Sequence, residues 1–196
     1  MWPWEHAAVG YVCYSIVSRL LSGEPPDGDP VLALAVGTQF PDVVDKTLSW
    51  GLGVFPTGYA AGHSVLVSVP VGVALVAAAA RGTQRRVAVA FVFGHWSHVA
   101  TDVLVTLRGG GDPEWGIALW PIVDREPYGD DLGLGRGLVY FAEYLADVAR
   151  SDVQTLLVVH LGLTALTVAL WLVDGAPGLH ALGARVRWFA RTVRSR

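Results

Sequence analysis

Cysteine is almost absent from this sequence, and charged residues are scarce. Cys13 is the single cysteine among 196 residues, so the chain has neither an internal disulfide nor a cysteine-based zinc site. Charged residues make up 16% of the chain, against about 25% in a typical soluble domain, while 53% of the residues are hydrophobic. The net charge of −3 leaves no positive excess of the kind that binds DNA or RNA, so no nucleic-acid partner is expected. The composition favours a protein embedded in lipid.

Hydrophobic runs are abundant instead. Five apolar segments lie between Gly, Pro or charged residues, at about 7–21, 30–40, 63–80, 87–107 and 153–173. The second is too short for a full crossing of about 20 residues and is expected to be a partial pass. Residues 138–150 form a predicted amphipathic helix. We expect an all-α fold, a polytopic membrane helix bundle of about four to five apolar helices and one interfacial helix, in a single domain over 1–196.

Basic residues are unevenly placed along this path. If each segment reverses the chain direction, nine of the fourteen lie on the side opposite to the first residues; these are Arg19, Arg81, Arg85, Arg86, Arg185, Arg187, Arg191, Arg194 and Arg196. Short cytoplasmic loops are enriched in Lys and Arg, so this side is expected to be cytoplasmic. The sequence thus predicts a protein integral to the cell membrane and in contact with membrane lipid. Its basic tail, 178–196, would be cytoplasmic, and its opposite side would face outward.

Six potential metal ligands converge on the outward side of this path. They lie at the starts of the first and third segments, just after the second, and near the end of the fourth; they are His6, Asp42, Asp45, His63, His98 and Asp102. His98 and Asp102 are four residues apart, so they share one helix face and can hold one ion together. Imidazole and carboxylate ligands without thiolate suit a divalent metal, first of all Zn, with Mn or Fe as alternatives. Asp42 or Asp45 would act as general base.

Several of these residues also have an ordinary structural interpretation. Asp42 follows a proline and can be a turn residue or a cap, and Asp45 can pair with Lys46 or with water. His6 and His63 can be polar residues at helix starts. Without the rest of the cluster, these interpretations would be preferred.

The fourth segment carries the strongest signal. Ionisable groups inside a membrane segment are costly, which favours ligation for His98 with Asp102 over simple packing. His95, one turn earlier, is expected either to support a ligand or to pack. His160 and His180 lie away from the cluster and are expected to be structural.

The order of these motifs resembles the YdjM-like membrane-bound metal-dependent hydrolases, which are similar in motif order to zinc-dependent phospholipases C. The resemblance covers about residues 1–125, with 178–196 as a separate basic tail. It is carried by His6, the segment 41–45, His63 followed by Ser64, the segment 94–102 ending in H-x-x-x-D, and the segment 119–121.

The resemblance implies metal-dependent hydrolysis at the membrane, with the six converging His and Asp residues as ligand candidates. Ser64 is a departure, since many members have Arg after the corresponding His. Arg108 and Arg125, both on the outward side, are candidates to replace a basic group that holds an anionic substrate, although a solvated loop position is the simpler interpretation of each.

Three functional hypotheses follow. The first is a hydrolase in which His and Asp hold one or two divalent ions that activate water against a lipid-like ester or phosphoester at the membrane surface. The second is a non-catalytic metal-binding or transport protein, ranked lower because polar residues are few toward the cytoplasmic side. The third is a structural bundle with buried polar pairs.

Overall fold

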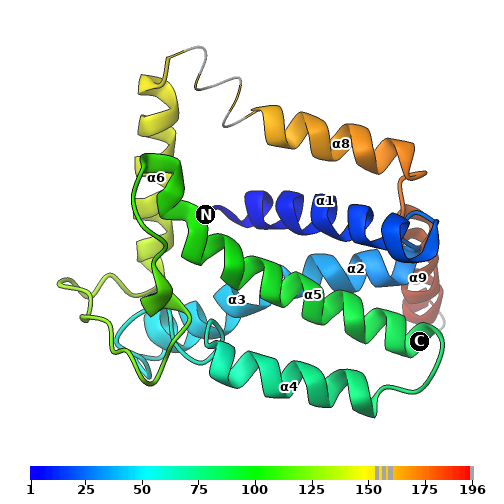
Figure 1. Cartoon of the computed structure of the whole chain (residues 1–196), viewed down its shortest axis with the longest axis horizontal. Helices are drawn as coiled ribbons and strands as arrows, with labels where there is room; N and C mark the ends of the chain where they lie inside the picture. Colours follow the sequence, from blue (N-terminus) through cyan, green and yellow to red (C-terminus); the bar gives the residue numbers. More distant parts are fainter. Residues whose placement is uncertain (153–154, 156–157, 159–160, 195–196) are drawn as a thin grey trace.

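The computed structural model describes residues 1–152, 155, 158 and 161–194 (Figure 1). Within these residues the fold is all-helical, as predicted, and contains no strand. The α-helices are α1 (Pro3–Ser22), α2 (Gly28–Gly37), α3 (Phe40–Lys46), α4 (Val65–Ala78), α5 (Thr83–Leu104), α6 (Arg136–Arg150), α8 (Leu163–Val173) and α9 (Leu179–Arg194). Short turns of π or 3-10 helix are η1 (Thr47–Gly51), η2 (Val105–Gly109), η3 (Trp115–Ile117) and η4 (Gly133–Gly135).

The helices alternate in direction along the bundle. In Figure 1, α1, α4 and α8 run from the end where the N-terminus lies toward the end where α9 lies, and α2 and α5 run back. The amphipathic helix α6 crosses the first of these ends. Because α2 and α5 both finish at this end, the residues that follow α2 and those in the last turns of α5 lie beside the start of α1.

Two glycines allow α2 and α5 to touch backbone to backbone. A Cβ atom on Gly37 would lie 2.2 Å from the carbonyl oxygen of Phe91, and one on Gly94 would lie 2.5 Å from that of Leu34. Neither position can therefore hold a larger residue without separating the helices. This close packing sets the second half of α5 directly against the end of α2.

The structure does not confirm the predicted count of four to five membrane spans. By length and apolar composition, the segment Thr83–Gly109, which comprises α5 and η2, is long enough to cross a membrane. The apolar helices α4 and α8 are shorter, and α2 has 10 residues. Residues 153–154, 156–157 and 159–160 of the fifth predicted segment, including His160, lie outside the described residues.

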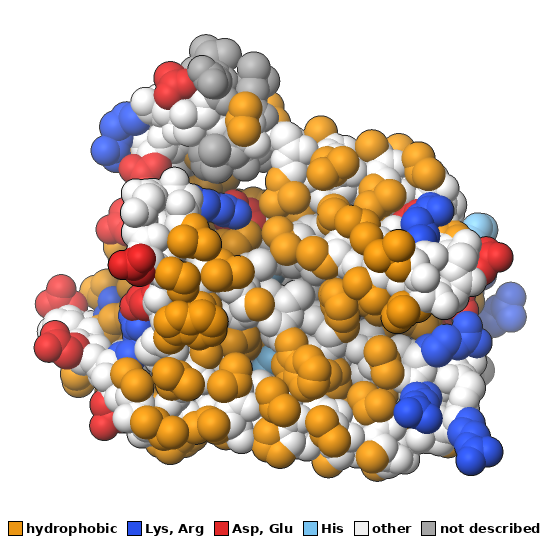
Figure 2. Space-filling model, viewed as in Figure 1, with side chains coloured by type: hydrophobic (Ala, Val, Ile, Leu, Met, Phe, Trp, Pro, Cys, Tyr) orange, Lys and Arg blue, Asp and Glu red, His pale blue; other side chains and the backbone are white. Residues whose placement is uncertain are grey.

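Charge and apolar surface are separated on the face seen in Figure 2. Basic side chains gather at the end where α9 lies, acidic side chains, with some basic ones among them, lie at the opposite end, and apolar side chains cover the area between. At the basic end, Arg185 pairs with Asp29 at 2.9 Å, and Arg86 lies 3.9 Å from Asp27. Such an apolar band between polar ends suits a protein surrounded by lipid.

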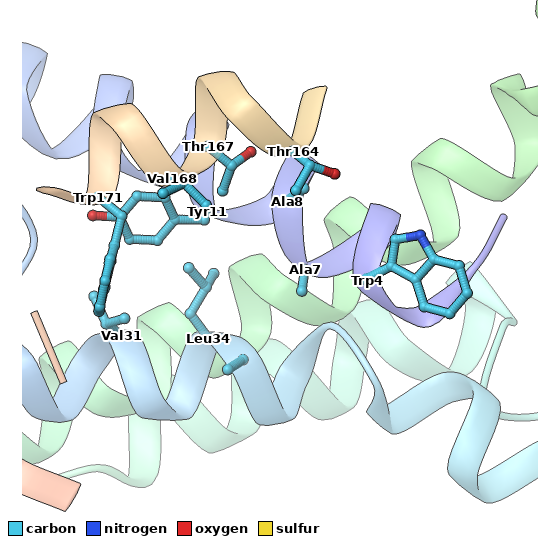
Figure 3. A pocket seen from close by; sticks show the side chains of 11 residues that line it. Trp4, Ala7, Ala8, Tyr11, Val31, Leu34, Thr164, Thr167, Val168 and Trp171 are labelled. Atoms are coloured by element: carbon cyan, nitrogen blue, oxygen red, sulfur yellow. The ribbon is translucent and has the colours of Figure 1, made fainter. Parts of the chain in front are cut away.

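An apolar pocket of about 350 Å³ lies between α1, α2 and α8 (Figure 3). Tyr11 and Trp171 line it, but their polar atoms are bonded elsewhere, the hydroxyl to Asp174 at 2.7 Å and the indole to the Pro177 carbonyl at 3.0 Å. Asp174 also accepts a bond from Ser15 and pairs with Arg19, which fastens α8 to α1. Among the described residues that line the pocket, Tyr11 is the one ionisable side chain, and its hydroxyl is already hydrogen-bonded to Asp174.

Candidate metal centre

Four ionisable side chains meet at the acidic end of the bundle, where α3, the turn before α4, and α5 come together. They are Asp42, His63, His98 and Asp102. One ligand atom from each lies within 4.8 Å of all the others. His63 and His98 are 0% exposed, Asp102 is 3% exposed and Asp42 8% exposed. Within the described residues, the predicted convergence of these four is confirmed.

The spacing of the four ligand atoms fits a tetrahedral ion. The Nε2 atoms of His63 and His98 are 3.2 Å apart, and each lies 3.4–3.7 Å from Asp42 Oδ1 and Asp102 Oδ2. Ligand atoms at about 2.0–2.1 Å from a tetrahedral ion are separated by about 3.3–3.4 Å. The cluster could therefore hold a metal ion with little rearrangement.

Hydrogen bonds fix both imidazoles with one nitrogen turned toward the centre. The Nδ1 atom of His98 donates to the Thr38 carbonyl at 2.6 Å, and that of His63 donates to Asp45 Oδ2 at 2.8 Å. With the protons on Nδ1, both Nε2 lone pairs face two carboxylate oxygens. In this neutral form of both rings the four acceptor atoms repel one another, and either a cation or a proton on Nε2 relieves the repulsion.

Asp45 contacts His63 from outside the cluster of four residues. Its Oδ2 accepts hydrogen bonds from the Ala60 and His63 backbone N–H groups as well as from the His63 ring, and its Oδ1 accepts one from Gly62. It is fully buried, and it does not pair with Lys46. Asp45 therefore holds the turn 60–63 and orients His63, instead of joining the four ligand atoms.

His6 adjoins the cluster from α1. Its ring stacks on His98 at 3.6 Å between centroids, and its Nδ1 bonds to Thr101 Oγ1 at 2.9 Å. Its Nε2 lies 3.3 Å from Asp102 Oδ1, is buried, and has no hydrogen-bond partner among the described residues. The Met1 amino group lies 3.1 Å from the same oxygen. His6 thus places a further ring nitrogen beside the cluster, on the other side of Asp102.

The remaining residues named from the sequence have structural contacts. His95 Nε2 donates to the Gly62 carbonyl at 2.8 Å, which supports the turn that carries His63. Ser64 stands at the N-cap position of α4, but its hydroxyl donates to the Trp120 carbonyl. His180 is exposed on α9.

The two arginines proposed as anion ligands both have carboxylate partners. Arg108 pairs with Glu5 at 2.8 Å, and Arg125 pairs with Glu114 at 2.6 Å. Arg125 also lies over the ring of Tyr59, 5.1 Å from its centroid, and the Tyr59 ring contacts that of His63 at 4.8 Å between centroids, which places Arg125 near the metal centre.

The YdjM inner membrane protein family model matches residues 1–177. The chain belongs to this family. The membership confirms the resemblance seen in the motifs and the membrane localisation expected from the composition. No curated protein and no solved structure matches the chain.

In this YdjM family member, Lys46 also belongs to the site, which the sequence did not predict. Its Nζ lies 2.5 Å from Asp42 Oδ2, one helical turn away on α3. Burial raises the pKa of the Asp42 carboxyl, but hydrogen bonds with His63 and His98, together with the Lys46 charge, outweigh this and hold it below its usual range. Asp42 is therefore an anion at neutral pH and available as a ligand.

His63 carries a proton when no metal is bound. Burial lowers its pKa from the usual 6.5, but hydrogen bonds with Asp102, Asp42 and Asp45 raise it more, to about 10. This raised pKa means that protonation stabilises the metal-free fold fully below about pH 6.5, and that the stabilisation is lost as the pH rises through about 10. A proton and a metal ion compete for the same nitrogen.

Metal affinity is expected to rise with pH between about 6.5 and 10, by about tenfold per pH unit, since binding releases the His63 proton. Competition with a chromophoric chelator, corrected for the chelator's own protonation, measures this slope. An affinity that stays constant across this range would contradict the competition.

Proposed function

We propose that this protein is a membrane-bound metal-dependent hydrolase that cleaves an ester or phosphoester at the membrane surface. The observation that carries the proposal is the pair of imidazoles whose Nε2 atoms face two carboxylate oxygens at 3.4–3.7 Å. The donor set suits Zn first, and Mn or Fe as alternatives. His6, on the other side of Asp102, would extend the set to a second ion.

Each residue then has a separate task. A divalent ion held by these side chains would need one further coordination position for water, and there it would supply a hydroxide near neutral pH. Asp42 has one oxygen toward the cluster and the other toward Lys46, and so can accept a proton from water as general base. Asp45 uses both oxygens within the fold and positions His63. We assign Asp45 this positioning role in place of ligand or base.

The orientation expected from the arginines fits this proposal. Basic side chains gather at the end where α9 is found (Figure 2), although Lys46, Arg108 and Arg125 lie at the end of the metal centre. With that end in the cytoplasm, the tail is cytoplasmic and the metal centre faces outward.

Metal content and turnover on the detergent-purified chain test this function. We expect one or two divalent ions per chain by elemental mass spectrometry. Hydrolysis of a carboxylic ester or a phosphoester should be lost with a chelator and restored by the ion. A chain that stays metal-free after reloading would overturn the proposal. Stoichiometric metal without turnover of either ester class would favour the non-catalytic metal-binding or transport alternative.

A further inference from the structure

A second pocket of about 770 Å³ opens beside the metal centre, and we call it the side pocket. Asp42 lines it and belongs also to the metal cluster, so a molecule in the side pocket would lie next to an ion held there. Among the described residues that line it, Asp42 is the single acidic side chain, while Lys46 and Arg125 are basic. Its remaining wall is largely apolar and aromatic, including Trp2, Leu134 and Tyr140.

Two hydrogen-bond donors of the side pocket, Trp50 and Tyr128, lie close to Gly58, together with the aliphatic part of Lys46. A Cβ atom on Gly58 would lie 3.2 Å from Lys46 Cγ, 3.2 Å from the Tyr128 hydroxyl oxygen and 3.4 Å from Trp50 Nε1. The Gly58 N–H donates to the Tyr128 hydroxyl at 3.0 Å, which leaves that hydroxyl proton for another acceptor. The Trp50 N–H is buried and has no acceptor among the described residues. The lack of a side chain at Gly58 leaves space between the Trp50 and Tyr128 donors.

Metal binding would change the charge of the side pocket where Asp42 and Lys46 line it. Without an ion, Lys46 neutralises Asp42 across 2.5 Å. Once Asp42 shares its charge with a divalent ion, the ammonium of Lys46 loses part of that attraction and is available to another anion. With the ion balanced by Asp42 and Asp102, and Arg125 paired with Glu114, the ammonium of Lys46 leaves the side pocket with an excess of positive charge that favours an anionic ligand.

From these contacts we propose that the side pocket binds the phosphate group of an amphipathic phosphate ester, with Lys46, Trp50 and Tyr128 as its donors and the aromatic wall around its apolar part. The inference rests on the proposed function and specifies its substrate class. A phosphate carries several acceptor oxygens and matches convergent N–H and O–H donors better than a neutral ester does. The phosphate can belong to a lipid headgroup or to a soluble ester.

The test titrates inorganic phosphate into the metal-loaded, detergent-purified full chain and measures its Kd by calorimetry. Lys46→Met removes the cationic donor and is expected to weaken binding about 10- to 100-fold. Gly58→Ala fills the space between the donors, leaves all of them in place, and is expected to weaken binding about tenfold or more. Arg150→Met removes an equal charge from an exposed position of α6 and should leave the Kd unchanged.

Metal content is measured on every variant, which separates this inference from the proposed function. Equal phosphate affinity in the wild type, Lys46→Met and Gly58→Ala, with the metal retained, would overturn the side-pocket inference and leave the hydrolase proposal standing. A metal-free wild type would overturn both. Displacement of phosphate by short-chain phosphatidic acid, but not by short-chain phosphatidylcholine, would support a lipid source; displacement by neither would support a soluble phosphate ester.

Discussion

Replacing His98 by alanine is expected to abolish stoichiometric metal binding, with affinity reduced by about 100-fold or more. Zinc binding to a structural site with four ligands is worth about 10–16 kcal/mol, or about 2.5–4 kcal/mol per ligand. The loss of one ligand therefore corresponds to about 100-fold or more in affinity. The Nδ1 bond to the Thr38 carbonyl holds the His98 ring with Nε2 in the centre, and its stacking on His6 removes any other position for it. Elemental mass spectrometry and chelator competition measure the loss.

His95→Ala is the matched control for this substitution. Both residues are buried histidines of α5, three positions apart, but His95 bonds to the Gly62 carbonyl and contributes no atom to the cluster. We expect His95→Ala to keep its metal with a smaller loss of affinity, about tenfold, since it supports the turn that carries His63. Circular dichroism verifies that both variants are folded. Equal metal loss in the two variants would mean that His98 acts through the fold and not as a ligand.

The convergence of the ligands could be predicted from the sequence because it follows from local rules. Apolar segment lengths and their end signals predicted helices that alternate in direction, and the i, i+4 spacing predicted that His98 and Asp102 share a face. The boundaries were close: α6 covers Arg136–Arg150 where 138–150 was expected. The span count could not be predicted in the same way, since an apolar run does not show how many of its residues the helix retains. The segment predicted at 63–80 forms a helix of 14 residues with Pro70 inside it.

The supporting residues could not be predicted, since they depend on irregular loops. Asp45 was predicted as another ligand because it follows the second segment together with Asp42, and only the turn at 60–63 reveals that backbone N–H groups occupy its oxygens. Trp50 and Tyr128 come together from segments 78 residues apart in the sequence, around Gly58. No periodicity links such positions, so tertiary structure alone brings them into one wall. The Asp42–Lys46 pair was the one local signal, at i, i+4.

Asp45→Asn is expected to destabilise the protein by about 3 kcal/mol and to weaken metal binding as well. Both carboxylate oxygens accept N–H donors, Oδ1 from Gly62 and Oδ2 from Ala60 and His63. An asparagine has one acceptor oxygen, so in either orientation its NH2 group must face a backbone N–H in a site that is 0% exposed. Leaving such buried donors unsatisfied costs about 1–3 kcal/mol, and more where a charge was lost.

The second effect of Asp45→Asn separates a positioning role from direct ligation. His63 loses the carboxylate that holds its Nδ1 proton, so its ring is oriented less well, and metal affinity should fall about 10- to 100-fold while His98→Ala loses more. Thermal unfolding of the metal-free protein measures the change in the free energy of unfolding, and chelator competition measures the change in metal affinity. Asp147→Asn, at an exposed site on α6, is the matched control and should change neither. If Asp45→Asn lost its metal entirely but melted like the wild type, Asp45 would be a ligand rather than the group that holds the turn.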